Sequence, residues 1–146
     1  MALDDKIPKV PEFSSMFPGS MYKFVQLYVD EEPYLRYGGF SNKHEDLIRQ
    51  FILECREKGQ PITDLALEKV TRSSELLKSG RYEAVGFGYI ERGSELIRGS
   101  NALIISGESL GFEIGPNKEH FEKLAKYIPN WKIELLKLPS NFLFPM

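Results

Sequence analysis

Apolar positions recur with two different periods along the chain. Residues 22–29 are rich in aromatic and β-branched side chains on both faces, which predicts a strand in the middle of a sheet. After Gly38 and Gly39, apolar residues recur at the spacing of one helical face from about 42 to 58. That stripe comprises Leu47, Ile48, Phe51, Ile52 and Cys55. We therefore expect a strand, with residues 34–37 as a short extension, and then an amphipathic helix.

The same two periods continue to the end of the chain. Pro61-Ile62-Thr63 opens a second run with helical spacing, which predicts a helix ending at Ser79-Gly80. Glycine-containing turns then separate extended, apolar segments, which predict an antiparallel meander of strands at 82–90, 102–105 and 110–114. A third helix is expected from Gly115 to Ile128, followed by a last strand at 131–135.

This order of elements predicts an α+β fold with a mostly antiparallel sheet and helices on one face. Within that class we expect a ferredoxin-like core with an inserted helix, formed by residues 21–138. Residues 1–20 contain three prolines and no periodicity, so we expect a leader or a cloning remnant outside the core. Residues 139–146 form an apolar C-terminal tail after the break at Pro139-Ser140-Asn141.

Composition and net charge limit the kinds of partner that the protein is expected to bind. The 146 residues suffice for one hydrophobic core, and the net charge of −2 lacks the basic excess that would neutralise nucleic-acid phosphates. No apolar run approaches the roughly 20 residues of a membrane-spanning helix. Cys55 is the only cysteine and has no partner for an internal disulfide, which is compatible with a reducing compartment. We expect a cytoplasmic protein that binds neither nucleic acid nor a membrane.

Both histidines of the chain lie in two similar fragments, Ser41-Asn42-Lys43-His44-Glu45 and Pro116-Asn117-Lys118-Glu119-His120. Each fragment begins a predicted helix, where free backbone amides can bind an anion. The candidate ligand-binding residues are therefore Asn42, Lys43, His44, Asn117, Lys118 and His120. The alternative is that the asparagines and glutamates of these fragments only cap the helices.

Acid–base chemistry or metal binding would require the two histidines to meet. Three strands in the meander would place the N-termini of the first and third helices at opposite ends of the sheet, which keeps the histidines apart. The chain contains no metal-binding motif such as H-E-x-x-H. We therefore expect no metal site and no cofactor.

Gly107-Glu108-Ser109-Leu110-Gly111 has the G-x-S-x-G spacing of a nucleophile elbow, after the strand predicted at 102–105. An elbow leads directly into a helix, and Gly111 and Gly115-Pro116 leave no room for one. A polar turn is the simpler interpretation. Gly86 and Gly88 leave one face of a predicted strand nearly bare, which indicates that a packed helix, or else a flat ligand or partner chain, lies across it.

No set of nucleophile, base and orienting group is evident, although such groups can also come from scattered positions. The sequence therefore favours a non-catalytic binding or regulatory module that acts on a protein partner or a small ligand, for example an anion. The enzyme alternatives are a small hydrolase using Ser109 with His120, or an acid–base enzyme using His44 and His120. The apolar tail, with Phe142, Leu143, Phe144 and Met146, further predicts a two-fold homodimer formed through strand edges or the tail. The alternative is that the tail docks on its own domain.

Overall fold

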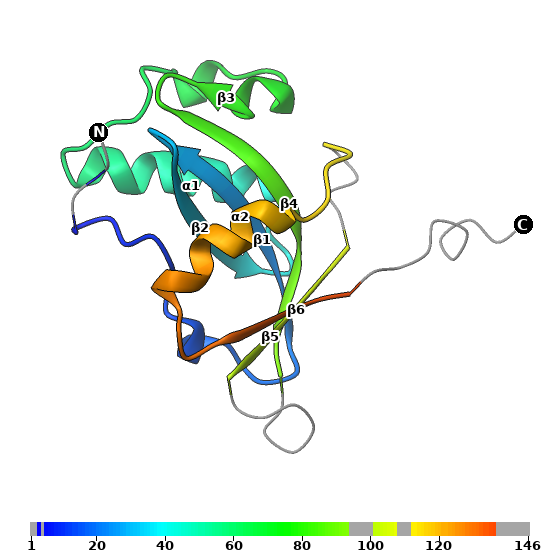
Figure 1. Cartoon of the computed structure of the whole chain (residues 1–146). Helices are drawn as coiled ribbons and strands as arrows, with labels where there is room; N and C mark the ends of the chain where they lie inside the picture. The colour runs from blue at the N-terminus through cyan, green and yellow to red at the C-terminus, as the bar shows by residue number, and fades with distance from the viewer. Residues whose placement is uncertain (1–2, 4, 94–100, 108–111, 137–146) are drawn as a thin grey trace, which may run out of the picture.

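The structure is a computed structural model that describes residues 3, 5–93, 101–107 and 112–136. Over these residues the chain forms a six-stranded, mostly antiparallel sheet with two α-helices (Figure 1). The strands are β1 (Met21–Val29), β2 (Glu32–Gly39), β3 (Lys78–Ser79), β4 (Tyr82–Arg92), β5 (Ala102–Ser106) and β6 (Lys132–Leu135). The helices are α1 (His44–Glu57) and α2 (Lys118–Leu124), with short 3₁₀ segments η1 (Phe13–Ser15), η2 (Leu67–Lys69), η3 (Ser73–Leu76) and η4 (Ala125–Tyr127). The predicted α+β class is confirmed.

The strand order is β2-β1-β4-β5-β6, and the short β3 pairs with β4. All pairs are antiparallel except β5 and β6, which run parallel because α2 connects them. β1 pairs with β2 on one side and with β4 on the other, so the strand predicted from residues 22–29 is indeed internal. The described sheet ends with β2 on one side and β6 on the other.

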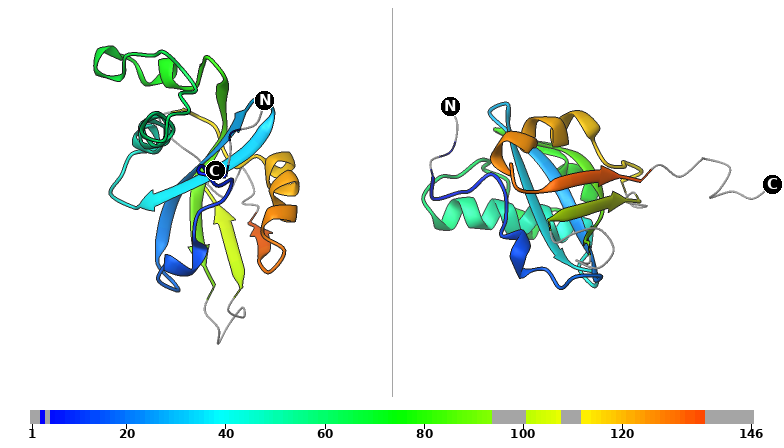
Figure 2. Two further views of the ribbon diagram at one scale, coloured as in Figure 1. Left: turned by 90° about the vertical axis from the view of Figure 1, so that its left-hand side faces the viewer. Right: turned by 60° about the horizontal axis from the view of Figure 1, so that its bottom comes forward.

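The two α-helices pack on opposite faces of the sheet, as Figure 2 (left) shows. The apolar stripe of α1 packs on the face that carries Val25, Leu27 and Val29. Phe121 and Leu124 of α2 pack with Phe24 on the other face. The expected placement of helices on one face is therefore not confirmed. The physical reason lies in β1, whose alternate residues are apolar on both sides and need cover on both.

The ferredoxin-like core is not confirmed either, because β1 and β2 form a hairpin before the first helix. Asp30 and Glu31 make its turn, with φ values of 51° and 72°. Residues 34–37 thus belong to a full strand rather than a short extension. Pro33 is compatible with β2 because β2 lies at the edge of the described sheet, where a missing N–H can be tolerated.

Two other predicted elements are corrected. Instead of a helix, residues 61–80 contain η2, η3 and β3. Here other hydrogen bonds replace the helical ladder: Thr63 Oγ1 accepts from the nearby Leu65 N–H, and Ile62 O accepts from Arg81 N–H farther along the chain. Of the strand expected at 110–114, residues 112–114 form a turn and an isolated bridge, with Glu113 at φ 57°. Residues 110 and 111 lie outside the described residues.

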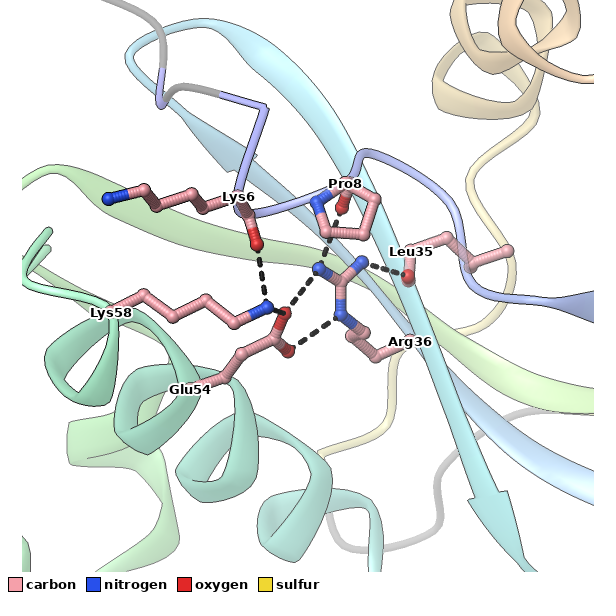
Figure 3. A network of polar contacts seen from close by, with 6 residues as sticks. All are labelled: Lys6, Pro8, Leu35, Arg36, Glu54 and Lys58. Carbon is pink, nitrogen blue, oxygen red and sulfur yellow. Dashed lines mark hydrogen bonds and ion pairs between the residues drawn. The ribbon is translucent and has the colours of Figure 1, made fainter.

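The N-terminal segment is part of the core, contrary to expectation. Ile7, Phe13 and Met16 are each at most 2% exposed, and Leu3 is also buried. The segment follows β2, where Leu35 N–H donates to Lys9 O at 2.9 Å. Figure 3 shows how Arg36 of β2 holds it: the guanidinium donates to Pro8 O at 2.7 Å and to both carboxylate oxygens of Glu54 in α1 at 3.0 Å. The N-terminal segment lacks a periodic pattern, so the sequence did not reveal these core residues, whose neighbours in the fold are distant in the chain.

Candidate functional site

His120 lies in the first turn of α2 and is fully buried. Its Nε2 lies 2.8 Å from Leu27 O of β1, and its Nδ1 lies 3.2 Å from Gln26 Nε2. A carbonyl oxygen can only accept, so Nε2 carries the proton and Nδ1 accepts from the glutamine amide. Burial lowers the pKa of His120 to about 4. The imidazole is therefore neutral at neutral pH, and both ring nitrogens are used within the protein.

Gln26, Asn117 and His120 form a buried polar cluster that fastens α2 to β1. Gln26 Oε1 accepts from Asn117 N–H at 2.8 Å, and Gln26 Nε2 donates to Asn117 O at 2.9 Å. Asn117 Oδ1 caps α2 by accepting from His120 N–H at 2.9 Å. The polar atoms of this cluster hydrogen-bond to other groups of the protein, as expected of residues that stabilise the fold.

Side chains of β1 and of the residue that caps α2 fill the bare stripe on β4. A Cβ atom at Gly86 would lie 2.0 Å from Gln26 Oε1, and one at Gly88 would lie 2.9 Å from the ring of Phe24. Asn117, at the start of α2, approaches the same point from above the sheet. The close approach therefore comes from a packed helix and from neighbouring side chains, the first of the two interpretations offered for this stripe.

His44 begins α1 on the other face of the sheet. It is 7% exposed, and its Nε2 lies 2.9 Å from Gly88 O of β4. Its ring contacts Phe87 and Tyr89 edge-on, and burial lowers its pKa. The sheet thus separates His44 from His120, and each histidine hydrogen-bonds to the main chain of a strand.

The remaining predicted anion-binding residues do not converge on one place. Asn42 packs against Gly38, and Lys43 and Lys118 are exposed. The cap of α1 lies one residue later than the sequence suggested, since Lys43 N–H donates to Asp46 at 3.1 Å. Glu45, the expected capping partner, instead accepts from Ser73. Among the described residues, no three His, Cys, Asp or Glu side chains gather as a metal site would require.

Ser109 lies outside the described residues, as does most of its G-x-S-x-G fragment. The preceding strand ends at Ser106, and Gly107 has φ 73°. The hydrolase alternative therefore stays a prediction from sequence.

A polar hollow of about 670 Å³ lies where the β1–β2 turn meets β3 and β4. Its lining carries charges of both signs, including Glu31, Lys78 and Glu83. Two of the lining cations are paired: Arg81 makes a bidentate contact with Asp30, which lowers the pKa of that carboxyl, and Lys123 pairs with Glu119 at 3.2 Å. An anion or cation entering the hollow would have to compete with these pairs. We therefore do not place the site there.

An apolar groove of about 280 Å³ lies between α2 and β6 and is called the β6 groove below. Its lining residues are Lys118, Phe121, Glu122, Ala125, Trp131, Ile133 and Leu135. Trp131 is the only tryptophan of the chain, and its ring packs against Phe13 at a centroid distance of 5.5 Å. Of these residues, the sequence had indicated only Lys118 as a candidate ligand-binding residue. The alternation of Ile133 and Leu135 with Lys132 and Glu134 predicted the strand but not that it lies at an edge.

Beside this groove, β6 is the last strand on its side of the described sheet. Lys132 N–H donates to Asn101 O at 2.7 Å, and Leu136 N–H donates to Ile105 O at 2.8 Å. The backbone groups of the intervening Ile133 and Leu135 therefore point away from β5. No described segment hydrogen-bonds to them. Open backbone groups beside an apolar groove make this edge the strongest candidate site in the described part of the chain.

None of the α-helices in the described part of the chain combines the length and apolar character needed to cross a membrane. Searches for relatives give no further guide to function: no protein-family model matches the chain, and no curated protein matches it significantly.

Proposed function

We propose that the protein is a non-catalytic binding module, and that it binds an extended, apolar segment of a protein partner along β6. The observation that carries this proposal is the pairing of two complementary features at one edge. Ile133 and Leu135 offer backbone groups to an added strand, and the β6 groove offers an apolar surface to alternate side chains of that strand. Main-chain pairing with side-chain pockets beside it is a common mode of peptide recognition.

The condition of the two histidines supports a binding role over an acid–base role. Both are buried and hydrogen-bonded to strand carbonyls, and burial lowers the pKa of each. A general base needs access to its substrate, and neither ring has it here. A small anionic ligand at the helix starts is likewise less supported than a protein segment at β6, because Asn117 and Asp46 already occupy the capping positions.

The proposal extends to self-association of the chain and to its location in the cell. A second copy of the chain is itself a source of extended segments, so a two-fold dimer through β6 edges is one form of the proposed interaction. Cys55 is a free, buried thiol, which supports a reducing compartment such as the cytoplasm.

The intrinsic fluorescence of Trp131 provides the test, because this side chain lines the β6 groove. The probe is a short blocked peptide in which phenylalanine and threonine alternate, titrated into the full chain and into a chain ending at Leu138. We expect a saturable change in Trp131 emission. A second peptide with serine in place of each phenylalanine should produce none.

Two matched variants locate the binding. Ala125→Arg places a long charged side chain in the groove from an exposed position, so it should abolish the fluorescence change. Leu53→Arg makes a similar change at a residue of α1 that is 52% exposed, on the other face of the sheet, and should leave binding intact. Absence of saturable binding by both chains, or equal binding by both variants, would refute the proposal.

A further inference from the structure

We infer that residues 142–146 of the chain itself cover the β6 edge in the isolated protein, folding back as an antiparallel strand beside β6. This inference rests on the proposed function, because it assigns an internal occupant to the same edge and groove. The segment, Phe142-Leu143-Phe144-Pro145-Met146, lies outside the described residues. Its length and the positions of its apolar residues match the edge that β6 offers.

The connection between the two strands suits a hairpin. β6 ends at Leu135, and Leu136 still donates to β5. A four-residue loop made of Leu138, Pro139, Ser140 and Asn141 would reverse the chain there. Loops of about two to five residues are the usual hairpin connections, and proline, serine and asparagine are favoured in them.

With this loop, Phe144 stands opposite Leu135, and Met146 stands opposite Ile133. Directly opposed residues of an antiparallel pair place their side chains on the same face. Phe142, Phe144 and Met146 would therefore lie on the face of Ile133 and Leu135, which both line the β6 groove. In this pairing, the alternate apolar side chains of the segment face the β6 groove.

Pro145 selects the same register independently. Opposite Glu134, its nitrogen faces outward from the sheet, so its missing N–H removes no ladder hydrogen bond. A shift by one residue would place Pro145 opposite Ile133, whose carbonyl points to the edge and needs a donor. The same shift would turn the two phenylalanines away from the groove. Two unrelated properties of the sequence therefore agree on one pairing.

The consequence is competition between this segment and a partner. An added strand would have to displace residues 142–146, which a short loop holds close to the edge. The chain ending at Leu138 should therefore bind the alternating peptide more tightly than the full chain does. Two-fold pairing of β6 edges is likewise expected for the shortened chain only.

Hydrogen exchange of β6 amides, followed by NMR, tests the inference. In the full chain, the amides of Ile133 and Leu135 should be protected to a degree comparable with those of Lys132 and Leu136, which donate to β5. Phe144→Asp should accelerate exchange at Ile133 and Leu135 by about tenfold or more, because it removes the groove contact. Lys132 and Leu136 should not change, which shows that the variant remains folded.

Leu143→Asp is the matched control, since it changes the neighbouring apolar residue, which faces away from the groove in this register. It should leave all four amides protected. Rapid exchange of Ile133 and Leu135 in the full chain, or equal effects of the two variants, would overturn the inference. Light scattering on the full chain should give a monomer, and a dimer would overturn the inference.

The peptide titration separates this inference from the proposed function. Saturable binding to both chains with equal affinity would refute the internal occupant and leave the partner site standing. Protection of Ile133 and Leu135 in the full chain, with no peptide binding to the chain ending at Leu138, would refute the partner site and leave the internal occupant standing.

Discussion

The two outer strands of the described sheet, β2 and β6, differ in what covers them. Along β2, Leu35 N–H donates to Lys9 O, and Tyr37 Oη donates to Glu12 O at 3.0 Å. Along β6, no described segment provides such bonds to Ile133 or Leu135. The irregular N-terminal segment thus covers part of the β2 edge, whereas within the described residues the β6 edge presents the open backbone groups that attract an added strand.

Phe13→Ala tests the cover of β2 and should have the largest effect. Phe13 is 2% exposed and packs between Tyr37 and Trp131, so truncation should lower the free energy of unfolding by about 3–5 kcal/mol. The measurement is urea denaturation. Phe17→Ala is the control, because Phe17 is 73% exposed and its loss should cost less than about 0.5 kcal/mol. Equal effects would mean that the N-terminal segment does not belong to the core.

Acid should weaken the attachment of α2, and with it one wall of the β6 groove. The folded-state pKa of His120, about 4, lies below its ordinary value of 6.5, so the unfolded chain binds the proton more readily. The stabilisation is complete above pH 6.5 and is lost as the pH falls towards 4. Each pKa unit corresponds to about 1.4 kcal/mol, which gives a loss of about 3 kcal/mol over this window.

Urea denaturation at several pH values, with His120→Gln for comparison, isolates this contribution. The variant should be less stable at pH 7 and should depend less on pH between 6.5 and 4. An NMR titration that finds His120 protonated near pH 6.5 in the folded protein would contradict the prediction.

Arg36→Met should loosen the cover of β2 more gently. The Arg36 side chain is 13% exposed and bonds to Pro8 O, Leu35 O and the carboxylate of Glu54. Losing these bonds should cost about 2 kcal/mol and accelerate hydrogen exchange at the Leu35 amide. Arg72→Met removes an arginine whose side chain is 80% exposed, and should change neither quantity measurably. A protected Leu35 amide in Arg36→Met would show that Arg36 is not needed to hold the segment.

Ala125→Arg at the β6 groove should have the smallest effect on stability, within about 0.5 kcal/mol, because Ala125 is exposed. Thermal or urea denaturation measures it. A large loss would indicate that the groove is filled by core packing rather than open to a partner, and would contradict the contrast between the two edges.

Patterns in the sequence predicted those helices and strands that depend on contacts between residues close together in the chain. The stripe from Leu47 to Cys55 produced α1 because helical spacing places those side chains on one face. Asn117 caps α2 as a polar residue at a helix start should. The same kind of pattern failed for Leu67, Val70 and Leu77, which are partly buried at the margin of the core without any α-helix between them.

The spacing of neighbouring residues is sufficient to predict the α+β class, the internal position of β1 and the amphipathic character of α1. The placement of α1 and α2 on opposite faces and the contact between Phe13 and Trp131 became evident from the folded chain. The tertiary structure alone separated His44 from His120 and left β6 at an edge. These features depend on which strands pair and which faces remain to be covered, and both are decided by contacts between residues far apart in the chain.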